Sequence, residues 1–105
     1  MPQNLTIKQW NPDDRPREKL LEKGASSLSV AELMAIVIGS GSPGESAVAL
    51  MKRVLHNHQN GLGDLHNSSL QNLLRFKGIG VAKAIKIKAA LELSVRLNHL
   101  PDSEK

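Results

Sequence analysis

The alternation of apolar and polar positions predicts a chain of short helices. Ser29, followed three residues later by Glu32, precedes an apolar run at 33–38. This spacing is the signature of a capping box, so we predict a buried helix over 30–38. A strand is the competing interpretation for 36–38, but the cap favours a helix. A second helix is predicted over about 45–58, with a packed face made of Ser46, Ala47, Leu50, Met51, Val54 and Leu55.

Three further helices follow from the same reasoning. Pro16 and Gly24 bracket a short helix, since proline suits the first helical position and glycine the position after the end. Ser68 and Gln71 form a second predicted capping box and open a helix over 70–76. The last helix is expected over about 81–98, with one packed face made of Ala84, Ile87, Leu91 and Val95.

These elements predict an all-α domain at 15–98, built from about five short helices arranged as two helical hairpins. Residues 1–14 lack a helical period and are interpreted as an extended arm, in which Trp10 is an anchor to the body. Residues 99–105 are polar and are interpreted as a linker or an end.

The turn between the last two helices is the leading candidate for a binding site. It carries Lys77, Gly78, Ile79 and Gly80 and leads into a helix that starts near Val81. The amides at the start of a helix lack partners within the helix and attract anions. We therefore expect Gly78, Ile79, Gly80 and Val81 to present amides. The Ile79 side chain should turn inward, and charge should come from Lys77, Lys83 and Lys86.

This segment resembles a helix-hairpin-helix motif. The resemblance rests on Phe76-Lys77-Gly78-Ile79-Gly80, with Leu73, Ala84 and Ile87 at the expected apolar positions. Members of that class typically bind the DNA backbone without reading sequence, and proline is common where Lys77 stands. The competing interpretation is a glycine turn that only joins two helices.

A second glycine-rich segment, 39–46, permits two readings. Its G-x-x-x-x-G-x-S spacing suggests a nucleotide loop, but Glu45 stands where that loop needs lysine, and a carboxylate repels phosphates. We instead expect a looser hairpin whose candidate contacts are Gly39, Ser40, Gly41 and Ser46. Whether this turn contacts DNA stays open, because Glu45 opposes phosphate.

The charge distribution supports a nucleic-acid partner. The 105 residues include 14 Lys and Arg against 10 Asp and Glu, a net charge of +4. Residues 75–96 hold six basic residues and one acidic residue, a net of +5, so the rest of the chain carries −1. A basic helix beginning at a phosphate-binding turn is typical of a DNA-binding protein. A solvated lysine face is the alternative.

The amino-acid composition argues against several other classes of protein. There is no cysteine, which is compatible with the cytoplasm, and no apolar run long enough for a membrane span. Only Trp10 and Phe76 are aromatic, which argues against base stacking on the protein. We expect no cofactor, no membrane partner and no small-molecule substrate.

The sequence contains no convincing set of catalytic or metal-binding residues. His56 and His58 form an H-x-H pair, but at a predicted helix end side chains two residues apart diverge by roughly 200°. Neither a metal site nor a catalytic residue is therefore expected, and the chain alone is predicted not to be an enzyme.

Several motifs in order also resemble the N-terminal region of the RadC family, also called UPF0758. They are residues 15–21, 28–33, 39–41, 76–80 and 90–93. The resemblance implies a paired helix-hairpin-helix domain, followed in the family by an MPN/JAB domain with a zinc metallopeptidase motif. The family name suggests DNA repair. The function expected is sequence-nonspecific binding of the DNA backbone, with a protein-interaction module that positions the second domain as the alternative.

Overall fold

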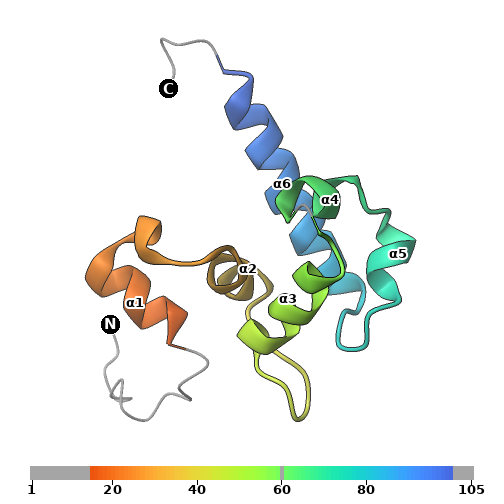
Figure 1. The fold of residues 1–105 in the computed structure, drawn as a ribbon, viewed down its shortest axis with the longest axis horizontal. Coiled ribbons are helices and arrows are strands. Elements are labelled where there is room, and N and C mark those ends of the chain that lie inside the picture. Colours follow the sequence, from red (N-terminus) through yellow and green to blue (C-terminus); the bar gives the residue numbers. More distant parts are fainter. Residues whose placement is uncertain (1–14, 60, 101–105) are drawn as a thin grey trace. The chain divides into compact units, whose positions relative to one another are not determined.

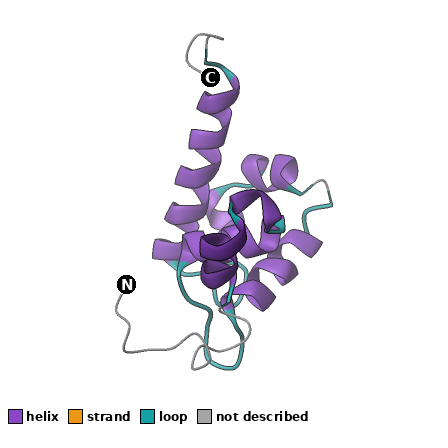
Figure 2. Cartoon of the chain, turned by 90° about the vertical axis from the view of Figure 1, so that its left-hand side faces the viewer, coloured by secondary structure: helices purple, strands orange, loops and turns teal. Residues whose placement is uncertain are grey.

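The structure is a computed structural model that describes residues 15–59 and 61–100. The predicted arm at 1–14, with Trp10, and the last part of the predicted linker lie outside the described residues. The described elements are all helices and loops, apart from a single bridge between Ser42 and Glu45 (Figure 2). The predicted all-α class is confirmed.

The elements run in the order α1 (Pro16–Lys23), the 3₁₀ helix η3 (Ala25–Ser27), α2 (Val30–Ile38), α3 (Ala47–His56), α4 (Leu62–Asn67), α5 (Leu70–Leu74) and α6 (Val81–Asn98) (Figure 1). The chain divides into two compact units, residues 1–54 and 55–105. Among the described helices, none is long and apolar enough to cross a membrane.

The first unit is organised by the start of α2. Ser29 accepts a hydrogen bond from the Glu32 amide at 3.1 Å, and the Glu32 carboxylate accepts one from the Ser29 amide at 2.8 Å. This reciprocal pair is the predicted capping box. Lys19 on α1 reaches Glu32 at 3.2 Å, so the same carboxylate also joins α1 to α2.

The buried positions of the first unit follow the predicted pattern. Helix α2 buries one face, while Val30 and Leu33 on its other side are exposed, so this helix is less enclosed than its apolar run suggested. In α3 the predicted packed face is confirmed. The fully or nearly fully buried residues of these two helices are Ala31, Met34, Ala35, Ile38, Ala47, Leu50, Met51 and Val54.

The second unit is organised around α6, which contacts both α4 and α5. Its predicted packed face is confirmed, since Ala84, Ile87 and Leu91 are buried and Val95 is half-buried. Leu65 from α4 and Leu73 from α5 are completely buried in this unit. The C-terminal half of α6 extends beyond α4 and α5 (Figure 1).

Helix α4 was not predicted, because its glycines suggested only a turn. A contact from α6 supplies hydrogen bonds at the C-terminal end of α4. The Lys88 ammonium donates to the carbonyls of His66 and Ser68, both at 2.8 Å. A cation at a helix C-terminus satisfies carbonyls that have no partner within the helix and complements the helix dipole.

The predicted capping box of α5 is wrong by one residue. The N-cap is Ser69, not Ser68, and its hydroxyl accepts a hydrogen bond from the Asn72 amide at 3.0 Å. Ser68 is buried instead and accepts a hydrogen bond from the Asn72 side-chain amide at 2.7 Å. Helix α5 also ends at Leu74 rather than Phe76, because the chain tightens into the turn described below.

Candidate nucleic-acid interface

The turn between α5 and α6 is built from short-range backbone hydrogen bonds. The amides of Arg75, Phe76 and Ile79 each donate to the carbonyl three residues earlier, at distances of 3.0–3.2 Å. Gly78 occupies the third position of the four-residue turn 76–79 and has φ of 94°. A positive φ at that position is typical of a type II turn and favours glycine. The second position, held by Lys77, is the one that proline prefers in such turns.

The Ile79 side chain turns inward as predicted, with 4% of its surface exposed. Its amide, however, donates to the Phe76 carbonyl at 3.0 Å. Ile79 therefore holds the turn closed, and we correct the expectation that its amide faces a ligand. The amides of the first turn of α6, from Val81 onward, are the better placed donors.

Gly80 is the N-cap of α6 and makes no side-chain cap. Its backbone is extended, with φ of −91°, and a Cβ placed on it would meet no atom within 4 Å. Neither conformation nor packing requires glycine here. By contrast, serine side chains cap α2 and α5. The start of α6 is thus left open toward solvent.

Three predicted lysines lie in the turn or in the first two turns of α6. Lys77 and Lys86 are exposed, whereas Lys83 is half-buried and its ammonium lies 3.4 Å from the Gly78 carbonyl. Lys83 therefore also ties the first turn of α6 back to the loop. Arg75, at the C-cap of α5, is exposed and adds a cation that was not among the predicted DNA contacts.

The remaining basic residues of the segment have other partners. Lys88 completes α4, as described above, and Arg96 pairs with Glu92 at 3.1 Å on the exposed surface of α6. The exposed basic residues between 75 and 86 are Arg75, Lys77 and Lys86.

A buried histidine packs against the turn between α5 and α6. His58 lies two residues after the end of α3 and is only 7% exposed. Its ring packs against Phe76 with centroids 5.7 Å apart and planes tilted by 35°. Phe76 carries the carbonyl that closes the turn, so His58 positions the hairpin. The neighbouring His56 is exposed, and no cluster that could hold a metal occurs within the residues described.

The first glycine-rich loop uses its polar groups internally. Ser42 and Glu45 exchange two backbone hydrogen bonds of 2.9 Å across Pro43 and Gly44. The Glu45 carboxylate forms two hydrogen bonds with the Arg53 guanidinium, at 2.8 and 3.0 Å. These bonds raise the pKa of Arg53 above its ordinary value. Arg53 also neutralises the carboxylate that was expected to oppose phosphate.

Two predicted contacts in that loop have structural roles. Ser46 accepts a hydrogen bond from the Ala49 amide at 3.1 Å and so occupies the amides at the start of α3. A Cβ on Gly41 would clash with the backbone of residues 45–47, which explains this glycine through close packing. Gly39 ends α2 with φ of 86°, and Ser40 is exposed. The loop is therefore a different structure from the turn at 76–79.

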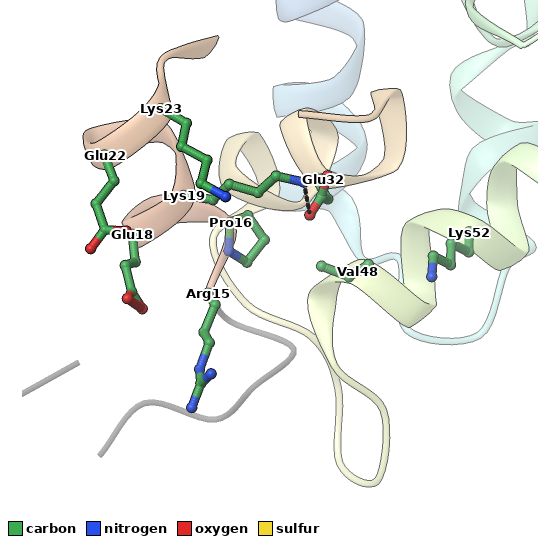
Figure 3. Close-up of a pocket in the computed structure, with 9 residues that line it drawn as sticks. All are labelled: Arg15, Pro16, Glu18, Lys19, Glu22, Lys23, Glu32, Val48 and Lys52. Atoms are coloured by element: carbon green, nitrogen blue, oxygen red, sulfur yellow. Dashed lines mark hydrogen bonds and ion pairs between the residues drawn. The ribbon is translucent and has the colours of Figure 1, made fainter. Parts of the chain in front are cut away.

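The first unit also contains a pocket of about 350 Å³ (Figure 3). Both basic and acidic side chains line it, and Lys19 pairs with Glu32 at 3.2 Å. Its lining residues are Arg15, Pro16, Glu18, Lys19, Glu22, Lys23, Glu32, Val48 and Lys52. With four basic and three acidic residues, it is not a dedicated anion site.

The fold and the turn define a small all-α module with an open, lysine-flanked helix N-terminus. The family model described as UPF0758 N-terminal matches residues 7–85. The chain therefore belongs to the UPF0758 family and represents its N-terminal region.

Relatives in several bacteria extend the match. A UPF0758 protein of Flavobacterium johnsoniae is 57% identical over 93 residues, which are 89% of this chain and 40% of the relative. One from Caldanaerobacter subterraneus is 46% identical over 94 residues, covering 90% of this chain and 40% of the relative. One from Xylella fastidiosa is 48% identical over 92 residues, covering 88% and 41%. The chain thus spans about two fifths of these relatives. No solved structure matches it.

Proposed function

We propose that the α5–α6 turn binds the phosphate backbone of DNA without reading base sequence. Gly80 is the observation that carries the proposal. The fold does not require glycine there, yet a side chain that caps α6 would occupy the amides an anion needs. Gly80 leaves room for a phosphate to approach Val81 and the amides that follow.

The surrounding charges suit the same ligand. Lys77 and Lys86 are exposed and Lys83 lies over the turn. A phosphate at the helix start would meet the positive end of the dipole and these ammonium groups together. Backbone contacts of this kind position a protein on DNA but carry no direct sequence information.

We extend the proposal to the longer family proteins in three respects. The chain corresponds to the DNA-binding N-terminal region of the RadC family, whose name suggests a role in DNA repair or recombination. The part of the relatives beyond this region is expected to carry an MPN/JAB metallopeptidase-like domain, so any catalysis would belong there. A DNA partner makes the cytoplasm the expected compartment.

The test is a binding titration with a short fluorescent duplex and a branched DNA at several salt concentrations. The double variant Lys77→Glu with Lys86→Glu should lower affinity at least tenfold and reduce the salt slope by about two, because each lost phosphate contact removes about one. This pair is preferable to one that includes Lys83, since Lys83 also contacts the turn.

The matched control is Lys23→Glu with Lys52→Glu, which makes the same change in net charge on exposed residues of the first unit. It should bind nearly as well as the unmodified chain. Equal losses in both double variants would show that only overall charge matters, and absence of binding by the unmodified chain at low salt would refute the proposed function.

A further inference from the structure

Helix α6 carries a second apolar surface, separate from its buried face. Residues Val81, Ile85, Ala89, Leu93 and Leu97 follow one another at intervals of four and are all exposed. We call this row the α6 ridge. Leu93 is 68% and Leu97 59% exposed, which makes them two of the most exposed large apolar residues described.

The spacing of the ridge is that of a helix-packing surface. Side chains four residues apart form a continuous ridge that fits the groove of a facing element. Glu92 and Arg96 lie beside it and form an ion pair of 3.1 Å, which leaves a polar border next to Leu93 and Leu97. An apolar centre with a polar rim is the usual composition of a protein interface.

We propose that the C-terminal half of the ridge docks the part of the protein that follows this region in the UPF0758 family. The chain covers 40% of the Flavobacterium johnsoniae relative, so the other 60% of that protein lies outside the match. The matching family model is the N-terminal one and ends at residue 85, within α6. The rest of the relative therefore follows this region in the sequence. Leu93 and Leu97 lie near the C-terminal end of α6, which is the end that leads toward it.

The size of the ridge favours a covalently attached occupant over a second copy. Separate proteins that associate stably bury about 800 Å² on each partner. One row of four large side chains supplies less than that. A domain joined to this region by a short flexible linker is present at an effective concentration on the order of millimolar. A small interface is therefore enough to keep it docked. The C-terminal half of α6 also extends beyond α4 and α5 (Figure 1), so a following domain has access to it.

The experiment uses a full-length protein in which residues 1–98 of this chain replace the matching part of the Flavobacterium johnsoniae relative. Amide hydrogen exchange over residues 91–98 is compared with that of the 105-residue chain. Docking should slow exchange at least tenfold in the full-length protein. The double variant Leu93→Lys with Leu97→Lys should abolish the slowing while leaving helical circular dichroism unchanged.

Ser94→Lys is the matched control, because Ser94 is an exposed residue of α6 outside the ridge. It should keep the slowed exchange. Equal exchange in the long and short proteins, or slowing that survives the double leucine variant, would overturn the proposal. So would a concentration-dependent dimer of the 105-residue chain that the leucine variant dissociates, because the ridge would then belong to a second copy. DNA binding does not enter this readout.

Discussion

Gly78 and Gly80 flank the same buried isoleucine, yet their backbones are of opposite kinds. Gly78 has φ of 94°, whereas Gly80 has φ of −91°. The first conformation is strained for any residue with a side chain, and the second is ordinary. The two glycines of the hairpin therefore serve different purposes, and substitutions can separate the folding of the turn from its binding.

Gly78→Ala should destabilise the turn. Placing a side chain at positive φ costs about 1 kcal/mol, and this cost should appear as a lower free energy of unfolding in urea. Ala89→Gly is a useful comparison at an exposed helical site, where glycine costs a similar ~1 kcal/mol for a different reason, helix propensity. If Gly78→Ala has no effect on stability, the positive φ does not describe the turn in solution.

Gly80→Asp should separate stability from binding. Aspartate is among the best N-cap residues, and its charge is favourable at the helix start, so α6 should be at least as stable as before. The same carboxylate would occupy the amides and repel phosphate. We expect a thermal midpoint that is unchanged or raised, with DNA affinity lowered at least tenfold.

The control for this substitution is Ser94→Asp, which adds the same charge farther along α6. It lies 13 residues after Val81, roughly 20 Å along the helix, and should weaken binding much less at moderate salt. Unchanged affinity in a folded Gly80→Asp protein would eliminate the start of α6 as the anion site.

Local signals predicted a large part of this fold. Ser29 and Glu32 identified the start of α2, and the spacing of Ala84, Ile87 and Leu91 identified the buried face of α6. At these positions the helix cap or the helical period is determined by residues that are close together in the sequence. The inward position of Ile79 was predictable for the same reason.

Other features depend on contacts between distant residues. Helix α4 contains Gly63 and is completed by Lys88, which is 22 residues away from His66 in the sequence. The support of Phe76 by His58 and the pairing of Glu45 with Arg53 likewise need the folded chain. The spacing of Ser68 and Gln71 indicated the wrong N-cap, because two adjacent serines offer the same hydroxyl and only the folded chain buries Ser68 and leaves Ser69 to accept the Asn72 amide.

Stability in acid should depend on Glu32. The hydrogen bond from the Ser29 amide, helped by Lys19, lowers the pKa of this carboxyl below its ordinary value of 4.5. A lowered pKa means that the ionised form stabilises the folded state. This contribution is present above pH 4.5 and is lost as the pH falls through the lower folded value.

The corresponding variant is Glu32→Gln, measured by urea unfolding between pH 3 and 7. Glutamine can still accept the Ser29 amide, so only the charge is lost; stability near neutrality should fall by about 0.3–1 kcal/mol, the scale of a charge at a helix N-terminus, and the acid side of the curve should flatten. Glu92→Gln provides the comparison, since its pair with Arg96 is exposed and should contribute little. Identical pH profiles for Glu32→Gln and the unmodified chain would contradict this role.

Lys88 should matter for folding and not for DNA. Its ammonium donates to the carbonyls of His66 and Ser68, so Lys88→Met would keep most of the apolar stem and remove both hydrogen bonds. Hydrogen bonds to charged groups contribute about 1.5–3 kcal/mol where partly buried. We expect a loss of stability at the lower end of that range, with the amides of α4 the first to exchange their hydrogens with solvent.

Lys86→Met, two residues earlier and exposed, should show the reverse pattern, with unchanged stability and weaker DNA binding. If Lys88→Met instead weakened DNA binding in a protein of unchanged stability, the division between structural and binding lysines on α6 would be wrong.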